Sequence, residues 1–380
     1  MPGQPSNTSA EGLRVLMVTP RYLPEMGGVE NHVHQVASRL SQAGVQITVL
    51  TTDREGNLPA DESMSGVRVA RVRAWPARRD YYFAPGIYSY IQQRKWNLVH
   101  IQSYHTLVAP LAMLSARRTK TPYLLTFHGG GHSSRFRNAA RGLQLAMLRP
   151  LLSHAERLIT LAHFEEAFYA EKLHLPASKF MLIPNGADLP QPVSRPQQKN
   201  GGTLIASVGR LERYKGHQRI ISAMPAILKS KPDVRLWVAG KGPYEPALRS
   251  LAKKLGVEDR VQFHAIPPED REGMAQKLAQ ASLVVLLSEY ETHPIAILEA
   301  LALGCPTLVS NTSGLGELSE QGMSRAIPLD STPDQVATAV LAQLSNPLIP
   351  GKMTLPSWDD CAEGLWHIYK EISARQQCIF

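Results

Sequence analysis

The stretch that decides the fold is residues 288–305, SEYETHPIAILEALALGC. It follows an apolar run, Ser282 to Leu287, which is typical of a buried strand. We predict a helix from Pro294, a residue that suits the first helical position, to Leu303, with Gly304 as its C-terminal cap. Glu299 is the only charged residue of this helix. Burying an unpaired carboxylate is costly, so Glu299 either serves a ligand or lies on a narrow solvated face.

The length and composition indicate a globular protein with two domains. At 380 residues the chain exceeds one ordinary core, and its residues are 43% hydrophobic and 19% charged. No apolar run reaches the roughly 20 residues that span a bilayer, and the first residues, MPGQPSNTSAEG, lack a signal-peptide core. Three scattered cysteines give neither metal spacing nor a disulfide framework. We therefore expect a cytoplasmic protein.

The positive charge is concentrated in the first half of the chain. Residues 1–190 carry 21 Lys and Arg against 13 Asp and Glu, whereas the two kinds nearly balance in residues 191–380. Between Asp80 and Glu156 there is no acidic residue and there are nine basic ones. Such a surface attracts an anionic membrane, an acidic acceptor or nucleic acid, or is simply solvated.

Strands and helices alternate along the chain in two series, which is the pattern of parallel sheets covered by helices. Apolar runs predict strands at 13–19, 45–51, 67–72, 97–102, 122–127, 157–161, 180–183, 204–208, 235–239, 260–264, 282–287 and 307–310. Helical spacing predicts helices at 29–43, 82–93, 107–117, 134–153, 217–229, 244–255, 271–281, 294–303 and 358–374. The Pro- and Gly-rich segment 189–202 separates the series as a linker. We therefore predict an N-terminal Rossmann-like domain over 1–188, a second over 203–355, and a final segment, 356–380, that packs back on the first.

Ligands of open parallel sheets bind beyond the carboxyl ends of the strands, and polar or glycine-rich segments follow five predicted strands here. With two doubly wound sheets facing a central cleft, all five segments would line it. They are Met26-Gly27-Gly28, His128-Gly129, Gly209 through Gly216, Gly240-Lys241-Gly242, and Glu289 through Glu299.

Two of these segments suit phosphate. Arg210 and Lys215 stand five residues apart after a strand, and two cations match the charge of a diphosphate. Arg213 and Lys241 share that charge or lie on the surface. Gly27 and Gly28 precede a helix, where the backbone can approach a phosphate closely, although a simple turn explains them equally well.

Glu291 and Glu299 stand eight residues apart across the start of the predicted helix. Their carboxylates suit vicinal hydroxyls of a ribose or a hexose, and the helix N-terminus between them suits a bridging phosphate. His128 ends an apolar strand and is followed by three glycines. It either hydrogen-bonds a ligand or caps the strand within the core.

Together these segments resemble the retaining glycosyltransferases of family 4, which have the GT-B fold. The resemblance is carried by E-x7-E from Glu291 to Glu299 and by four further motifs in the same order along nearly the whole chain. These motifs are GGVENHV (27–33), LTFHGG (125–130), LIPNGAD (182–188) and VGRLERYKGH (208–217).

The resemblance implies a hexosyltransferase that binds a UDP- or GDP-linked sugar mainly through its C-terminal domain. By position, Glu299 holds the ribose hydroxyls, Arg210 and Lys215 neutralise the diphosphate, and Glu291 lies beside the donor sugar. His128 lies near the reacting sugar, and the glycine loop lies near the donor phosphate. The expected catalytic residues are His128, Arg210, Lys215 and Glu291, and the expected binding residues add Gly27, Gly28, Gly240, Thr292, His293, Pro294, Ile295 and Glu299.

One departure from the family concerns the loop after the first acid, which is commonly E-G-F-G. Here Thr292, His293 and Pro294 replace it, so the contact with the phosphate and the choice of sugar are expected to differ. No Asp-x-Asp occurs, so we expect no metal ion and no cofactor besides the donor substrate.

The acid-free basic region bears on the acceptor. Between residues 135 and 152, arginines interleave with leucines and a methionine, as in a peripheral amphipathic helix. We expect a sugar or lipid-linked acceptor, such as a polyprenyl-diphosphate sugar in polysaccharide or glycolipid assembly, and no nucleic acid. The protein would then lie on the inner face of the cell membrane. A helix packed within the N-terminal domain is the alternative.

Two other functions fit the same fold. A nucleotide-sugar epimerase of the GT-B fold shares the diphosphate site, but no array of carboxylates for proton abstraction is evident in the N-terminal half. A non-catalytic nucleotide-sugar binding protein would not need Arg210, Lys215, Glu291 and Glu299 together.

Overall fold

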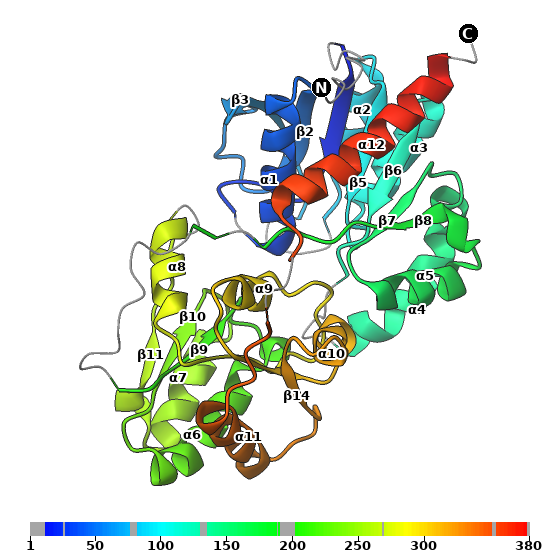
Figure 1. Cartoon of the computed structure of the whole chain (residues 1–380). Coiled ribbons are helices and arrows are strands. Elements are labelled where there is room, and N and C mark those ends of the chain that lie inside the picture. Colours follow the sequence, from blue (N-terminus) through cyan, green and yellow to red (C-terminus); the bar gives the residue numbers. More distant parts are fainter. Residues whose placement is uncertain are drawn as a thin grey trace, which may run out of the picture. The chain divides into compact units, whose positions relative to one another are not determined.

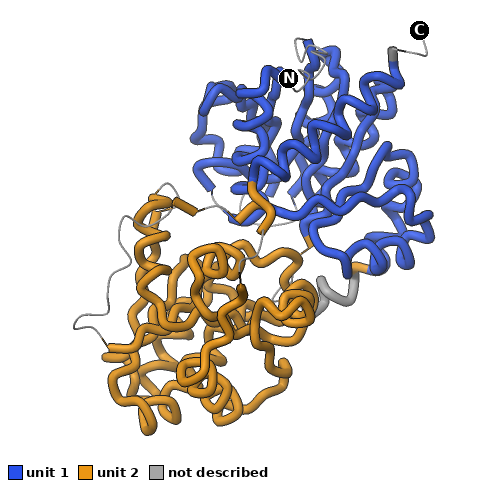
Figure 2. Tube along the Cα trace, viewed as in Figure 1, with its two compact units in different colours: residues 1–128, 142–185, 358–380 blue, residues 129–141, 186–357 orange. Residues whose placement is uncertain are grey.

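The computed structural model divides into two compact units, which are described separately (Figures 1 and 2). Unit 1 comprises residues 1–128, 142–185 and 358–380, and unit 2 comprises 129–141 and 186–357. The structure describes residues 12–25, 27–76, 82–129, 135–187, 189–190, 202–267, 270–351 and 355–377, without the side chains of 135–140. Most of the predicted linker, 189–202, therefore lies outside the described residues.

Unit 1 is built on an eight-stranded sheet with the order β3-β4-β2-β1-β5-β6-β7-β8. All neighbouring strands are parallel except the edge strand β3, which runs antiparallel to β4. The strands are β1 (Arg14–Val18), β2 (Gln46–Asp53), β3 (Asp61–Met64), β4 (Val67–Arg73), β5 (Leu98–Gln102), β6 (Tyr123–Thr126), β7 (Leu158–Thr160) and β8 (Phe180–Leu182). The strand order reverses between β1 and β5, so a ligand site is expected at that switch point.

Helices cover this sheet, and the last helix of the chain is one of them. The helices are α1 (Gly28–Gln42), α2 (Pro85–Gln92), α3 (Val108–Arg118), α4 (Arg135–Leu152), α5 (His163–Leu173) and α12 (Trp358–Gln377). Helix α12 lies beside α1 (Figure 1), and an ion pair joins Arg39 of α1 to Asp359 of α12. Helix α12 is therefore part of unit 1, although it follows the residues of unit 2 in the sequence.

Unit 2 has a six-stranded parallel sheet with the order β11-β10-β9-β12-β13-β14. The strands are β9 (Leu204–Val208), β10 (Arg235–Ala239), β11 (Val261–Phe263), β12 (Leu283–Leu286), β13 (Thr307–Ser310) and β14 (Arg325–Ile327). Here the order reverses between β9 and β12. The residues that follow these two strands therefore face the same crevice at the carboxyl edge.

Two apolar clusters cover the two faces of this sheet. The helices are α6 (His217–Ser230), α7 (Glu245–Lys254), α8 (Arg271–Ala279), α9 (Ile295–Ala302), α10 (Ser313–Glu320) and α11 (Pro333–Ser345). One cluster joins the sheet to α6, α7 and α11, and the other joins it to α8, α9 and α10. Because both faces are buried, the strands are almost wholly apolar, as their sequences indicated.

All twelve predicted strands are present, and the nine predicted helices are found with shifts of a few residues. One detail was wrong: α9 begins at Ile295 and not at Pro294. Pro294 has a non-helical ψ of 85°, while its carbonyl accepts from the N–H groups of Ile297 and Leu298, so it is the cap that precedes the helix. Gly304 follows the helix with φ 71°, as a C-terminal cap requires.

Several elements were not predicted: β3, β14, α5, α10 and α11. A signal for α11 was nevertheless present in the sequence. Thr332 accepts from the N–H of Gln335, and the side chain of Gln335 accepts from the N–H of Thr332, which is a capping box. Pro333 occupies the first turn, which adds to that signal.

Gly216 fixes the approach of α6 to the carboxyl end of β12. It has φ 78°, and a Cβ placed there would lie 1.9 Å from the carbonyl oxygen of Leu287. No other residue type fits this left-handed turn without moving the backbone of the neighbouring strand end. The spacing between the loops that follow β9 and β12 therefore depends on this glycine.

We predict that Gly216→Ala destabilises the protein far more than Gly256→Ala. Gly256 also has a left-handed φ, 65°, but a Cβ there would meet nothing within 4 Å. Gly256→Ala should cost about 1 kcal/mol of unfolding free energy, and Gly216→Ala roughly 3 kcal/mol or more because of the added clash. Urea unfolding of the three proteins measures both values. Equal losses would show that the contact with Leu287 has no influence.

Candidate functional site

The carboxyl edge of the unit 2 sheet holds an ion pair between Lys215 and Glu291. Lys215 ends the short 3-10 helix Arg213–Lys215 in the loop after β9, and Glu291 lies in the loop after β12. Lys215 Nζ lies 2.6 Å from Glu291 Oε1, and only 16% and 11% of the two side chains are exposed. The pair therefore lies at the predicted switch point of the sheet.

Three hydrogen bonds besides the ion pair hold Glu291 in place. Ser288 Oγ donates to Glu291 Oε1 (2.7 Å) and also contacts the carbonyl of Lys215 (3.2 Å). The backbone N–H of Glu291 donates to Ser313 Oγ (2.9 Å), and its carbonyl accepts from the N–H of Gly314 (2.9 Å). Both recorded side-chain contacts use Oε1, and no partner of Oε2 is recorded in the described part of the chain. Oε2 therefore remains available to a ligand hydroxyl.

The charge of Lys215 is maintained by its partner. Burial by itself would lower the pKa of Lys215, but the negative charge of Glu291 and the nearby Tyr214 raise it above its ordinary value. Lys215 is therefore an ammonium group with three N–H donors, of which Glu291 takes one.

Arg210 lies next to this pair and is exposed. Its Nη2 donates to Tyr214 Oη (3.0 Å), and the ring of Tyr214 also lies 5.4 Å from Lys215 Nζ. The Arg210 carbonyl accepts from Nε2 of the buried His217 (3.2 Å), whose Nδ1 contacts Ser207 Oγ (2.8 Å). Burial lowers the pKa of His217 to about 4, so His217 is neutral and anchors the loop. The structure thus brings together the two cations that the sequence predicted.

Gly240, which follows β10, closes this edge of the sheet. It has φ 146°, and a Cβ there would lie 1.9 Å from the carbonyl oxygen of Gly209. The loops after β9 and β10 are therefore in direct backbone contact. This contact explains the glycine at position 240 by packing, and it keeps Arg210 next to the strand end.

Glu299, the charged residue of α9, is 4% exposed and forms an ion pair with Arg271 at the start of α8. Arg271 was not predicted from the sequence, because it lies 28 residues before Glu299 on a different helix. The pair explains how an apolar helix carries a buried carboxylate. Each of the two predicted acids therefore has its own cation.

The residues between the two acids are largely buried. Thr292 is 5% exposed, and its Oγ1 donates to the carbonyl of Gly129 (2.5 Å) of the same unit. Pro294 is buried, whereas His293 and Ile295 are half-buried. A Cβ on Gly314 would lie 1.9 Å from the Thr292 carbonyl, so this turn packs tightly against α10.

The remaining predicted residues lie in unit 1. Gly27 caps α1, and a Cβ there would lie 2.6 Å from Glu30 Oε2, whose other oxygen lies 3.3 Å from Arg21 Nε. A Cβ on Gly28 would meet nothing within 4 Å, so this position faces open space, and Met26 lies outside the described residues.

His128 follows β6 and is 7% exposed. Its Nε2 lies 2.7 Å from Gln102 Oε1, at the end of the neighbouring strand β5, and its ring lies 4.8 Å from that of His32. Burial lowers the pKa of His128 well below its ordinary value, and the nearby His32, His100 and His105 add to this effect. His128 is therefore a neutral imidazole at the carboxyl end of β6, in contact with the end of β5.

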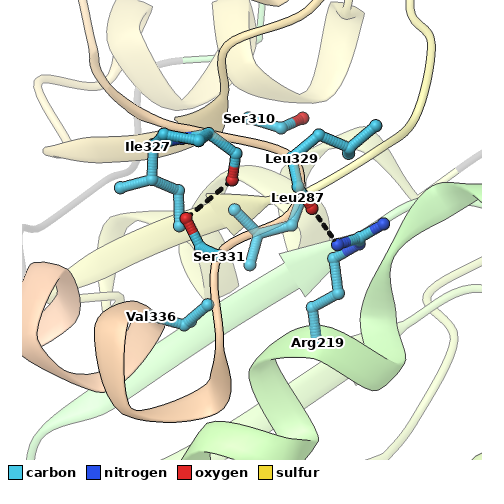
Figure 3. A pocket seen from close by; sticks show the side chains of 8 residues that line it. Arg219, Leu287, Ser310, Ile327, Leu329, Ser331 and Val336 are labelled. Carbon is cyan, nitrogen blue, oxygen red and sulfur yellow. Dashed lines mark hydrogen bonds between the residues drawn. The ribbon is translucent and has the colours of Figure 1, made fainter.

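A separate hollow in unit 2 lies between α6, α11 and the loop after β14 (Figure 3). Arg219 spans it and donates to the Leu329 carbonyl, while Ser331 Oγ donates to the Pro328 carbonyl (2.7 Å). The hollow is too narrow for a water molecule. It is therefore a packing feature that ties α6 to this loop.

Among the described residues, no three His, Cys, Asp or Glu side chains are arranged to hold a metal ion. No described helix combines the length and the apolar character needed to cross a membrane.

Comparisons with known proteins find two glycosyltransferase family models, one for each half of the chain. Residues 26–191 match the family model "Glycosyltransferase Family 4", and residues 192–354 match "Glycosyl transferases group 1". The chain is 27% identical over 363 residues to a glycogen synthase of Mycobacterium tuberculosis, covering 88% of this chain and 87% of that one.

A second relative and a solved structure extend this likeness. The GDP-mannose:cellobiosyl-diphosphopolyprenol alpha-mannosyltransferase of Xanthomonas oryzae is 25% identical over 342 residues, covering 87% of this chain and 88% of that one. The crystal structure of Anabaena Alr3699/HepE in complex with UDP-glucose superposes with a TM-score of 0.71 at 16% identity, covering 96% and 99% of the two chains. The predicted fold of two doubly wound parallel sheets is thereby confirmed.

We predict that Arg271→Gln destabilises the protein by about 1 to 2 kcal/mol, because it leaves the buried Glu299 carboxylate without its cation. Arg249→Gln is the matched control, since Arg249 forms an exposed pair with Glu245 on α7. The control should change the unfolding free energy by less than about 0.5 kcal/mol. Urea unfolding distinguishes the two, and an effect of Arg271→Gln no larger than that of the control would contradict a buried pair.

Proposed function

We propose that this chain, a glycosyltransferase with the GT-B fold, transfers a hexose from a nucleotide-diphosphate sugar to an acceptor hydroxyl with retention of configuration. The observation that carries the proposal is the Lys215–Glu291 pair at the switch point of the unit 2 sheet, with Arg210 beside it. Such an edge offers cations for a diphosphate and a carboxylate for a sugar in one place.

The donor diphosphate would bind Lys215 and Arg210. The ammonium of Lys215 donates one N–H to Glu291, and its two other N–H groups can donate to phosphate oxygens. The guanidinium of Arg210 is exposed and suits bidentate contact with a phosphate. Glu291 would remain in place during binding and accept a sugar hydroxyl at Oε2.

The nucleoside would bind at Glu299, whose carboxylate accepts hydrogen bonds from the ribose hydroxyls. Arg271 orients this carboxylate through the ion pair at the start of α8. The half-buried His293 and the buried Thr292 lie between the two acids and would shape the part of the site that selects the sugar.

The transfer step follows from charge. As the bond from the sugar to the diphosphate breaks, negative charge develops on the leaving oxygen and positive charge on the sugar ring. Lys215 and Arg210 would stabilise the leaving group, so the proposal needs no metal ion. For retention, the acceptor hydroxyl attacks on the face from which the diphosphate leaves, and a phosphate oxygen takes its proton. His128 and Gly28 would contact the reacting sugar and the donor phosphate.

The names of related proteins support a nucleotide-sugar donor without choosing the base. One relative is named for GDP-mannose, and one structural neighbour was solved with UDP-glucose. The name of the mannosyltransferase also includes cellobiosyl-diphosphopolyprenol, which supports a lipid-linked acceptor for this chain.

Helix α4 supports the proposal that the acceptor lies at a membrane. Its Leu145, Leu148 and Leu152 are buried in the core of unit 1, whereas Leu143 and Met147 are 68% and 72% exposed. Arg149 is exposed on the same helix. Exposed apolar side chains on a helix that also carries an exposed basic residue suit the anionic headgroup region of a bilayer, so we propose that the protein binds at the inner face of the cell membrane.

We predict that Lys215→Ala lowers kcat/KM for sugar transfer at least about 100-fold, because a cation that meets the charge developing in the transition state is lost. It should also weaken binding of UDP or GDP in a thermal-shift panel. Lys254→Ala, at the end of α7, removes a lysine far from the strand edge and should have no effect.

A second variant separates the ligand role from the fold, since Lys215→Ala leaves the Glu291 charge unpaired. Lys215→Met combined with Glu291→Gln removes both charges and should restore stability without restoring transfer. Full transfer by either variant would refute the diphosphate role. Conversion of the donor into an isomeric sugar without an acceptor would favour the epimerase instead.

We also predict that the protein binds vesicles of anionic lipid better than neutral vesicles. Leu143→Ser combined with Met147→Ser should abolish most of this binding, because it removes the exposed apolar part of α4. Ile349→Ser is the control, since Ile349 is 55% exposed but belongs to unit 2. Vesicle sedimentation measures the binding, and equal binding to both kinds of vesicle would refute the membrane proposal.

A further inference from the structure

A chain of buried hydrogen bonds runs through unit 1 from the last helix to His128. Tyr369 Oη of α12 lies 2.6 Å from Nδ1 of His100 on β5. Nε2 of His100 lies 3.2 Å from Gln102 Nε2, and Gln102 Oε1 lies 2.7 Å from Nε2 of His128. Tyr369, His100 and Gln102 are each at most 1% exposed, and none of them belongs to the site derived above.

The protons of this chain follow from the orientation of the Gln102 amide, whose nitrogen faces His100 and whose oxygen faces His128. Burial lowers the pKa of His100 and of His128 well below the ordinary value, so each ring is neutral and carries one N–H. The amide nitrogen of Gln102 can only donate, and therefore Nε2 of His100 accepts. His100 then carries its proton on Nδ1 and donates it to Tyr369 Oη.

Thr126 is compatible with this arrangement. Its Oγ1 lies 2.7 Å from Nε2 of His100, and a hydroxyl can donate to that nitrogen. With His100 fixed in this way, the amide of Gln102 turns its nitrogen toward His100 and its oxygen toward His128. The oxygen can only accept, so His128 carries its proton on Nε2.

The consequence lies at the other nitrogen of His128. In the described part of the chain no partner of His128 Nδ1 is recorded, whereas the backbone carbonyl of His128 accepts from His105 Nε2 (3.1 Å). His128 therefore presents an unprotonated Nδ1, which can accept a hydrogen bond from a hydroxyl but cannot donate one.

We propose that Gln102 is a positioning residue that fixes His128 in the Nε2–H tautomer, and that Tyr369 of α12 sets the orientation of Gln102 through His100. This inference rests on the proposed function, because it gives His128 the task of accepting a hydrogen bond from a sugar hydroxyl. A neutral imidazole in the opposite tautomer would carry its proton on Nδ1 and could not accept a hydrogen bond there.

The alternative proton arrangement is equally definite. If Gln102 were turned over, its nitrogen would donate to His128 and its oxygen would accept from Nε2 of His100. His128 would then carry its proton on Nδ1 and offer a donor to the ligand. The two arrangements differ in one observable, which is the nitrogen of His128 that bears the proton.

Nitrogen NMR of the full-length protein labelled with 15N-histidine reads this observable directly, and His128→Asn assigns the signals by their loss. We expect His128 to be neutral and protonated on Nε2 in the wild-type protein. In Gln102→Leu and in Tyr369→Phe we expect a substantial fraction protonated on Nδ1. Tyr169→Phe is the control, because it removes another buried tyrosine hydroxyl of unit 1, bonded to Tyr104 and not to this chain. An Nδ1–H tautomer in the wild type, or an unchanged tautomer in Gln102→Leu, would overturn the proposal.

Kinetics supply the second measurement. Gln102→Leu should lower kcat roughly tenfold or more, with a smaller change in KM, because a misplaced proton disturbs the reacting geometry more than donor binding. Gln102→Glu keeps an acceptor beside His128 and should restore most of kcat. Its carboxylate would also raise the pKa of His128, whose other titratable neighbours are His32, His100 and His105. His128 would then become protonated at a higher pH, so activity should begin to fall at a higher pH as the solution is acidified.

The two measurements separate this proposal from the proposed function. Failure to find any donor and acceptor pair would count against the proposed function, while the tautomer of His128 would still decide the hydrogen-bond chain. A changed tautomer in Gln102→Leu with wild-type kcat would refute the positioning role.

Discussion

The buried ion pair between Lys215 and Glu291 is the constraint on which the carboxyl edge of unit 2 depends. Two opposite charges removed from water are tolerated only where each is close to the other and their remaining bonding capacity is used. The order of strands supplies the closeness, since β9 and β12 are neighbours in the sheet although 74 residues lie between them in the sequence. Ser288 and Ser313 supply hydrogen bonds to Glu291, and Gly216 lets the loop after β9 approach the end of β12.

Each acid at this edge is paired before any ligand arrives. Lys215 neutralises Glu291, and Arg271 neutralises Glu299, while the exposed Arg210 lies next to the first pair. In the proposed function, a diphosphate would meet the cations Lys215 and Arg210, although two carboxylates lie nearby. The carboxylates can then act as hydrogen-bond acceptors for hydroxyls without repelling the phosphates strongly. This arrangement would reconcile the two chemical tasks of the proposed nucleotide-sugar site.

The sequence predicts strands best where burial on both faces leaves no ambiguity. The bounds of β9 and β10 were predicted to the residue, because five mainly apolar residues end at a glycine in each case. Helix α5 was missed because its acidic residues obscure an apolar face, and one of them, Glu165, is buried and accepts from the Leu161 N–H. Lys215 and Glu291 were predicted by a resemblance of motifs, whereas their direct pairing was not. Arg271 was missed because an ion pair depends on where two helices cross, which no local pattern encodes.

The environment of His128 also depends on tertiary contacts that no local sequence pattern encodes. Its position after an apolar strand marks it as a candidate, but its proton depends on residues 26, 28 and 241 positions away. Gln102 and His100 alternate along one strand and so point to the same face of the sheet, where α12 brings Tyr369 against them. The last helix of the chain thus completes the bonding of a side chain at the carboxyl end of β6 in the first sheet. A site on such a fold is therefore assembled only when the chain has closed back on itself, and its chemistry is a property of tertiary packing more than of any motif.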